Sequence, residues 1–374
     1  MKQERNYGID LLRIVAIYMI LILHILGQGG VLKNIWIEAD CYEAAWTMEL
    51  MAYCAVNCYA LISGYVGLNS RFKLSNLFLL WGQVVFISVA SMAVFACMGT
   101  EITGNNLLHA CLPVASGTYW YFTAYFCLYL LTPFINRMIR EMNGKALGCL
   151  SLALLFLFSF MPTVLRRDMF FIDNGYSPVW LGVLYIFGAI LGKYKERIRT
   201  NKLVLLGGYI GAVALTVVSK FVLFHLNFFY DFTLYDDFIL IRYNSPTMVI
   251  ASLCLLLLFV DLKVKKISKV IKLLAPATFG VYIIHTEPFI WDYLLADRFY
   301  FLTELEPLPF IPIVIGSALG IYLVCTIIEL IRMYVFKLCR IPKLCKKLEE
   351  IFRKVLIPFM LSCGRKLLLG GNRE

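Results

Sequence analysis

The chain has 374 residues, of which 61% are hydrophobic and only 16% charged, and its mean hydropathy is +0.77. An average soluble domain is about 45–50% apolar and about 25% charged, so this chain has too few charges to cover a water-facing surface. The composition excludes secreted, disordered, nucleic-acid-binding and ordinary cytosolic proteins, and it predicts an all-α, polytopic integral membrane protein. The formal net charge of +11 is unusual for so apolar a chain.

Ten stretches have the length and composition of membrane-spanning helices, each of which needs about 20 mostly apolar residues. In chain order they are 7–27, 44–68, 76–98, 119–138, 146–164, 178–194, 203–223, 245–261, 275–296 and 310–336. The loops between them are too short to hold a soluble catalytic domain. We therefore expect a bundle of about ten transmembrane helices.

The basic residues alternate between the two sides of this predicted bundle. If the N-terminus lies in the cytoplasm, 29 of the 35 Lys and Arg residues fall on the cytoplasmic side and five on the outer side, with Lys220 inside the seventh stretch. Cytoplasmic loops of membrane proteins carry an excess of Lys and Arg. The charge pattern therefore predicts cytoplasmic N- and C-termini. The positive net charge is then explained by the excess of Lys and Arg that fixes the membrane topology.

The sequence divides into a membrane domain, residues 1–338, and a basic amphipathic cytoplasmic tail, residues 339–374. One face of residues 341–359 is apolar and the other carries Lys and Arg; the apolar face is formed by Ile341, Leu344, Leu348, Ile351, Phe352, Val355 and Phe359. This pattern predicts an interfacial helix on an anionic inner leaflet.

The first stretch contains three ionisable residues, Asp10, Arg13 and His24. Arg13 and His24 are eleven residues apart, so on a helix they share one face within about 20° and lie about 16 Å apart along the axis. Asp10 precedes Arg13 by three residues and lies on the same face. Ionisable residues inside a membrane are costly and mark functional sites by default. The competing interpretation is that Arg13 is a topology anchor and His24 a packed, hydrogen-bonded side chain.

A second polar group lies near the outer end of the ninth stretch, where His285 and Glu287 follow Tyr282. It is either part of the functional site or a structural network. Glu329 and Arg332 are three residues apart and predict a structural ion pair. The chain has no Cys-x-x-Cys pair, so we predict no metal site.

Asp10-Leu-Leu-Arg13 with His24 resembles the Arg-x10-His signature of the membrane-bound acyltransferase-3 family. Further similar segments follow in the family's order: the aromatic-rich stretch ending in Ser63-Gly64-Tyr65, the basic loop with Arg71 and Lys73, the segment Tyr119-Trp120-Tyr121 with Tyr125 that runs to Pro133, and Tyr282-x-x-His285. The resemblance covers residues 6 to about 336.

The resemblance implies a bacterial cell-membrane enzyme that transfers an acyl group, usually acetyl, from cytoplasmic acyl-CoA to a hydroxyl group. The acceptor would be a cell-surface glycan or its lipid-linked precursor. Acyl-CoA, usually acetyl-CoA, is then the expected co-substrate, with no metal, and the inner excess of positive charge suits this anionic donor.

The site residues follow from the resemblance together with the residue types. Histidine titrates near neutral pH, so His24 is the candidate general base or transient acyl carrier, and Arg13 and Asp10 would bind or orient the donor. We expect the other site residues in two groups: Arg71, Lys73, Ser63 and Tyr65 at the donor, and Trp120, Tyr121, Tyr125, Tyr282, His285 and Glu287 at the acceptor.

Each group also has a structural interpretation. Arg71 and Lys73 also fit the positive-inside rule, and the aromatic residues also fit an interfacial belt. Packing at a helix interface is favoured over a nucleophilic role for Ser63, because no Gly-x-Ser-x-Gly motif surrounds it. A transporter is the alternative function, but the two homologous halves often found in transporters are not visible in the sequence.

Overall fold

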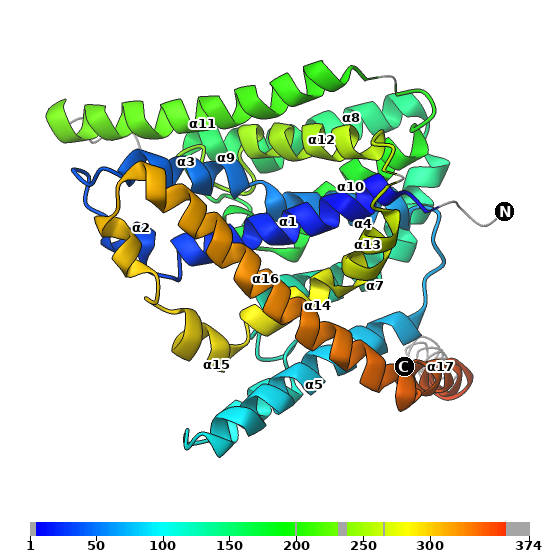
Figure 1. The fold of residues 1–374 in the computed structure, drawn as a ribbon. Coiled ribbons are helices and arrows are strands. Elements are labelled where there is room, and N and C mark those ends of the chain that lie inside the picture. Colours follow the sequence, from blue (N-terminus) through cyan, green and yellow to red (C-terminus); the bar gives the residue numbers. More distant parts are fainter. Residues whose placement is uncertain (1–4, 199, 231–237, 265, 357–374) are drawn as a thin grey trace, which may run out of the picture.

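The computed structural model describes residues 5–198, 200–230, 238–264 and 266–356, and every regular element within these ranges is helical (Figure 1). The first nine helices are α1 Tyr7–Leu26, α2 Val31–Asn34, α3 Tyr42–Ala52, α4 Ala55–Gly67, α5 Leu74–Cys97, α6 Gly104–Cys111, α7 Trp120–Glu141, α8 Gly144–Leu155 and α9 Met161–Leu165. The others are α10 Pro178–Lys193, α11 Lys202–Tyr230, α12 Pro246–Val260, α13 Ser268–Leu274, α14 Thr278–His285, α15 Pro288–Ile290, α16 Pro307–Leu338 and α17 Ile341–Ile351. The all-α prediction is confirmed.

Six helical segments of the described chain are long and apolar enough to cross a membrane, and this confirms a polytopic membrane protein. They are Tyr7–Asn34, Tyr42–Gly67, Leu74–Cys97, Gly144–Leu165, Lys202–Phe229 and Pro307–Leu338. The helices α10 and α12 are apolar but shorter, with 16 and 15 residues. The expected count of about ten is therefore not confirmed.

Helix α1 is the central element of the bundle (Figure 1). It packs against α3, α4, α12, α14 and α16. Asn6 starts the helix, because its side chain accepts a hydrogen bond from the amide of Ile9 (3.1 Å) and so satisfies one of the free N–H groups of the first turn. A helix that is apolar on most faces is buried on most faces, and its few polar residues are then held inside the protein.

Helices α4 and α10 approach each other closely through glycines. A Cβ atom on Gly64 would lie 2.0 Å from the carbonyl oxygen of Tyr185, and one on Gly188 would lie 2.0 Å from that of Leu61. No side chain fits at either position, so this close packing explains the glycine of the Ser63-Gly64-Tyr65 segment.

The ninth predicted span is broken into short pieces around α14 and α15. Helix α14 ends at His285, and Pro288 begins α15. The Glu287 side chain accepts hydrogen bonds from the amides of Phe289 (3.1 Å) and Ile290 (3.2 Å), so it caps α15, and it also accepts one from the Ser91 hydroxyl (2.5 Å). The break leaves His285 at a helix end in the middle of the protein.

The predicted ion pair between Glu329 and Arg332 on α16 is confirmed. Both side chains are buried, the Arg332 Nε atom donates to Glu329 Oε2 (3.0 Å), and Gln83 on α5 donates to Glu329 Oε1 (3.1 Å). The network joins α5 to α16 and places each buried charge against a partner.

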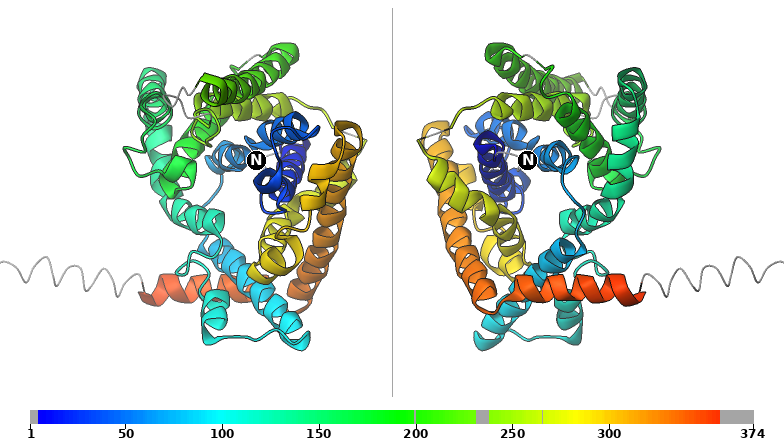
Figure 2. Two further views of the ribbon diagram at one scale, coloured as in Figure 1. Left: turned by 90° about the vertical axis from the view of Figure 1, so that its left-hand side faces the viewer. Right: turned by 90° about the vertical axis from the view of Figure 1, so that its right-hand side faces the viewer.

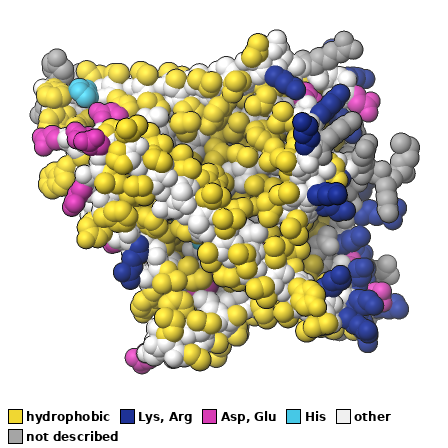
Figure 3. All heavy atoms as spheres, in the orientation of Figure 1, with side chains coloured by type: hydrophobic (Ala, Val, Ile, Leu, Met, Phe, Trp, Pro, Cys, Tyr) yellow, Lys and Arg dark blue, Asp and Glu magenta, His cyan; other side chains and the backbone are white. Residues whose placement is uncertain are grey.

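The two ends of the molecule differ in charge. On the face shown in Figure 3, Lys and Arg side chains gather at the end where α1 begins and α17 lies, and Asp and Glu side chains are more frequent at the opposite end. Helix α17 runs across the basic end beside α5 (Figure 2). Of the apolar face predicted for residues 341–359, Ile341, Leu344, Leu348 and Ile351 lie on α17, Phe352 and Val355 lie in the helical turn that follows it, and Phe359 lies outside the described residues.

Glu349 attaches α17 to the start of α5. Its carboxylate accepts hydrogen bonds from the amides of Leu74 (3.2 Å) and Ser75 (3.1 Å) and pairs with Arg353 (2.9 Å). Partial burial raises the pKa of Glu349, but the hydrogen bonds from the Ser75 side chain, Arg353 and the two amides outweigh it and lower this pKa to about 2. The carboxylate therefore caps α5 from a distant part of the chain.

We expect this attachment to weaken in acid. Because the folded pKa lies below the usual value of 4.5, the stabilisation is complete above about pH 4.5 and is lost as the pH falls towards about 2. At neutral pH, Glu349→Gln should lower the hydrogen-exchange protection of the first turn of α5 by about fivefold, the effect of losing a helix cap. Exposed Glu350→Gln is the control, and equal protection in both variants would contradict this role.

Candidate functional site

Within the described part of the chain, cavities at four places are lined by residues of the central helix α1. An inner cavity of about 570 Å³ is lined by Arg13, a narrow middle cavity of about 50 Å³ by Ile17, Ile20 and His24, and an outer cavity of about 550 Å³ by Leu23 and His24. A lateral, mostly apolar cavity of about 470 Å³ also reaches His24, from the side of α16. Of the polar residues predicted on one face of the first helix, Arg13 thus lines the inner cavity and His24 lines the middle and outer cavities.

The inner cavity is lined by three arginines, Arg13, Arg71 and Arg140. Asp10 is buried behind the cavity, where it accepts hydrogen bonds from Arg5 Nε (2.5 Å) and Arg13 Nη1 (2.7 Å). Asp10 therefore orients Arg13. The guanidinium groups form a cluster suited to phosphate or carboxylate ligands.

The other residues expected at the donor lie in different places. Ser63 lines the inner cavity, but its hydroxyl donates to the Tyr59 carbonyl oxygen (2.8 Å), as expected for a packing role. The Lys73 side chain is exposed and does not line this cavity, and neither does the buried Tyr65, which packs against α10 at Gly192. Tyr125, expected at the acceptor, lines the inner cavity.

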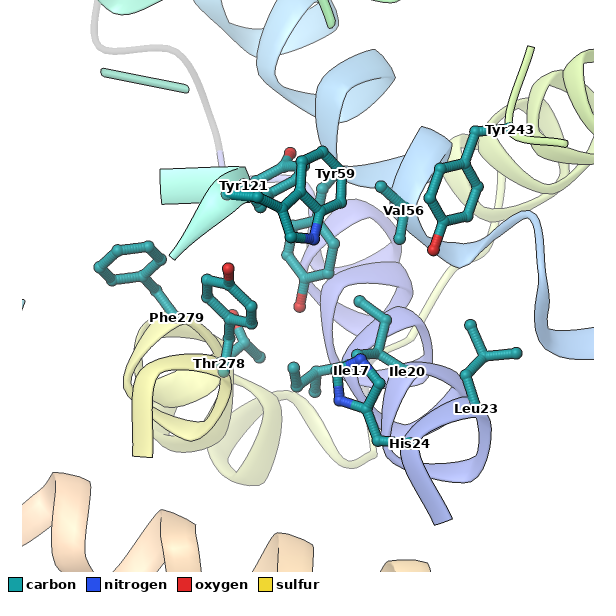
Figure 4. Close-up of a pocket in the computed structure, with 12 residues that line it drawn as sticks. Ile17, Ile20, Leu23, His24, Val56, Tyr59, Tyr121, Tyr243, Thr278 and Phe279 are labelled. Atoms are coloured by element: carbon teal, nitrogen blue, oxygen red, sulfur yellow. The ribbon is translucent and has the colours of Figure 1, made fainter. Parts of the chain in front are cut away.

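Side chains from α1, α4, α7 and α14 converge on the middle cavity (Figure 4). Tyr121 on α7 lines it, and the ring of this residue contacts the ring of Tyr125 in the inner cavity, with centroids 6.3 Å apart. Tyr59 also lines it and donates a hydrogen bond to the carbonyl oxygen of Arg13 (2.7 Å). Both tyrosines of the middle cavity therefore contact residues that line the inner cavity.

His24 and His285 form a direct pair, although 260 residues lie between them in the chain. His24 Nδ1 lies 2.8 Å from His285 Nε2, and His285 Nδ1 lies 2.6 Å from the carbonyl oxygen of Val281. His24 is partly exposed, whereas His285 is buried. The rings of His24 and Trp291 lie edge to face, with their centroids 4.7 Å apart.

The hydrogen bonds of this pair determine which nitrogens carry protons. A carbonyl oxygen only accepts, so His285 Nδ1 carries a hydrogen, and Nε2 of the neutral ring is then an acceptor. His24 Nδ1 must therefore donate to it, which leaves His24 Nε2 without a proton when both rings are neutral. His24 Nε2 is therefore the nitrogen that can accept a proton.

The outer cavity is rich in aromatic side chains. Trp120 and Tyr282 line it together with His24, and both also line the middle cavity. Tyr53 and Tyr243 stack on each other at its wall, with centroids 4.8 Å apart. Glu287, expected here, instead caps α15 and lines none of the four cavities.

Several residues at these cavities were not predicted from the sequence. They are Arg140, which in the sequence is one of many basic residues on the predicted cytoplasmic side, and Tyr59, Glu49, Trp291 and Asp292. Glu49 could have been predicted as a site residue, because it is an acidic residue within an apolar stretch. The other residues are of common types and become recognisable only through the packing.

An all-helical membrane bundle whose central helix carries polar groups between two cavities defines an integral membrane protein with an internal site. A family model described as an acyltransferase domain matches residues 6–330, and the chain therefore belongs to the acyltransferase-3 family. Family membership makes it a membrane acyltransferase with an acyl donor and an acceptor as substrates. Comparisons with curated proteins and with solved structures gave no match.

Proposed function

We propose that this protein is a membrane O-acyltransferase that moves an acetyl group from cytoplasmic acetyl-CoA to a hydroxyl group of a cell-surface glycan or its lipid-linked precursor. The observation that carries the proposal is the position of His24. This side chain lies between an arginine-lined cavity at the basic end of the bundle and an aromatic cavity towards the other end.

The inner cavity is the donor site in this proposal. Arg13, Arg71 and Arg140 supply positive charge for the phosphates of CoA, and Asp10 holds Arg13 in place. The middle cavity of about 50 Å³ favours a short acyl group such as acetyl. The positive-inside rule supports a cytoplasmic location for this basic end and for both termini, and in this proposal α17 lies on the anionic inner leaflet of a bacterial cell membrane.

His24 is the general base for the reaction. The hydroxyl oxygen of the acceptor attacks the thioester carbonyl carbon, and its proton moves to His24 Nε2. The C–S bond then breaks, and the proton passes from His24 to the leaving thiolate, so the products are the O-acyl ester and free CoA. A neutral His285 accepts a hydrogen bond from His24 Nδ1 throughout, and this holds the ring in the reactive tautomer.

The negative charge that develops on the carbonyl oxygen needs a hydrogen-bond donor. The buried Tyr121 hydroxyl has no hydrogen-bond partner among the described residues, and this side chain lines the middle cavity beside His24. We assign it the role of oxyanion donor. Its neighbour Tyr59 cannot take this role with the same proton, because its hydroxyl already donates to Arg13.

Arg71 and Lys73 provide a matched pair that tests the donor site. Only Arg71 lines the inner cavity, although both residues lie on the same basic loop. Arg71→Ala should raise the KM for acetyl-CoA by about tenfold through the loss of a charge-assisted hydrogen bond, whereas Lys73→Ala should change it little. Initial rates at varied acetyl-CoA concentration test this prediction. Equal effects of the two substitutions would show that Arg71 only contributes to membrane topology and does not bind the donor.

The function itself is tested with the purified full-length chain in lipid nanodiscs. Acetyl-CoA labelled in its acetyl group is supplied with an extract of bacterial surface glycans, and the products are separated and analysed by mass spectrometry. We expect free CoA and acetyl esters in equal amounts. Movement of a glycan precursor across proteoliposomes without consumption of acetyl-CoA would instead establish a transporter.

A further inference from the structure

Glu49 is a buried acidic residue that the catalytic steps above do not use. It lies on α3, its residue is only 8% exposed, and its Oε2 atom has no hydrogen-bond partner among the described residues. Burying a carboxyl group without partners is unfavourable, and ionisable residues in membrane-embedded segments mark ligand paths. A ligand that donates a hydrogen bond to Glu49 Oε2 would remove this cost.

Two other buried glutamates show what a structural role looks like in this protein. Glu287 accepts two amide hydrogen bonds and one from Ser91, and Glu329 is paired with Arg332 and Gln83. Their carboxylates are occupied by groups that hold helices together. Glu49 has no comparable set of partners, which separates it from these structural carboxylates.

The position of Glu49 indicates what would bind there. The residue lines the outer cavity, whose lining includes His24, and α3 packs against α1, which carries His24. Asp292 lines the same cavity, and the stacked rings of Tyr53 and Tyr243 form part of its wall. Carboxylates accept hydrogen bonds from hydroxyl groups, and aromatic faces pack against the C–H faces of sugar rings.

We propose that Glu49 binds the acyl acceptor by accepting hydrogen bonds from hydroxyl groups of a carbohydrate, so that another hydroxyl of the same sugar faces His24. This inference rests on the proposed function, because it assigns the outer cavity to the acceptor. Glu49 takes no part in proton transfer, and its loss affects recognition of the acceptor before it affects the chemistry.

Carbohydrate binding is measured first without any donor. The full-length chain in lipid nanodiscs is titrated with methyl glycosides of neutral hexoses and N-acetylhexosamines, and binding is followed by fluorescence of the cavity residues Trp120 and Trp291. Glu49→Gln keeps the shape of the side chain but replaces one of its two carboxyl oxygens with an NH2 group, which cannot accept a hydrogen bond. We expect about 10- to 100-fold weaker binding of the glycoside that the wild type binds best.

The matched control is Glu43→Gln, which changes an exposed carboxylate in the first turn of the same helix. It should leave glycoside binding unchanged, and neither variant should alter the affinity for acetyl-CoA. Acetyl-transfer rates with the same glycoside should then show a raised acceptor KM in Glu49→Gln and an unchanged donor KM.

Three results would overturn the proposal: no glycoside binding by the wild type, equal binding by Glu49→Gln, or a loss of acetyl-CoA affinity and thermal stability together in Glu49→Gln. The last result would assign Glu49 a structural role. If Glu49→Gln weakens glycoside binding but the wild type transfers no acetyl group, the binding role of Glu49 stands and the proposed function fails. If the wild type transfers acetyl and Glu49→Gln does so with unchanged KM, the function stands and the role of Glu49 fails.

Discussion

Replacing His24 with alanine should lower acetyl transfer by about 100- to 10,000-fold, the range expected for loss of a general base. The reason is the unprotonated Nε2 atom that the hydrogen bond to His285 leaves on this ring. Arg13 and the inner cavity remain intact in this variant, so acetyl-CoA should bind with wild-type affinity. Initial rates of CoA release and equilibrium binding of the donor measure the two effects separately.

A matched control is His225→Ala, which changes an exposed histidine on α11. Its activity should equal that of the wild type. His24→Gln is a second inactive variant, because glutamine can donate to His285 but is not a base at neutral pH. Wild-type rates in either His24 variant would remove His24 from the mechanism, and a parallel loss of donor binding would indicate a structural role.

His285→Leu should lower kcat by about 100-fold or more with little change in the KM for either substrate. This substitution removes the acceptor for His24 Nδ1–H, so the ring of His24 loses the partner that selects its tautomer and orientation. His285 is buried and hydrogen-bonded to the carbonyl oxygen of Val281, so we expect it to position the ring of His24 rather than to contact the substrates. Steady-state kinetics with each substrate varied in turn distinguish a kcat effect from a binding effect.

His285→Gln provides the rescue. The amide oxygen of glutamine can accept the hydrogen bond from His24 Nδ1, so this variant should recover part of the activity lost in His285→Leu. Equal activities of the two variants would show that the contact between the histidines has no role in catalysis. A general loss of folding would instead reduce the yield and thermal stability of both variants to the same extent.

The membrane fold was predictable because it depends on composition and long apolar stretches. Helix boundaries were less predictable where tertiary contacts decide them, as at α14 and α15. There the Glu287 cap and Pro288 interrupt an apolar stretch, and the interruption leaves His285 at a helix end. A hydropathy pattern cannot show such a break, since the hydrogen bond from Ser91 that helps to fix Glu287 comes from a distant helix.

Part of the candidate site was also visible in the sequence. Helical periodicity places Arg13 and His24 on one face, and both line the cavities of α1. The assignment of Lys73 and Glu287 to substrate contacts rested on local pattern, and the structure places both outside these cavities. Arg140 and Glu49 reach the cavities through packing between helices far apart in the chain, which no local spacing reveals.

The most direct test of transfer across the membrane is the sidedness of the reaction in sealed proteoliposomes. The protein is reconstituted in one orientation, so that the side of the membrane that its arginine-lined end faces is known. Labelled acetyl-CoA and the glycan acceptor are then placed inside or outside the proteoliposomes. We expect acetyl esters only when acetyl-CoA is on the side of Arg13 and Arg71 and the acceptor is on the opposite side. Formation of the ester with both substrates on the same side, or with their sides exchanged, would contradict it.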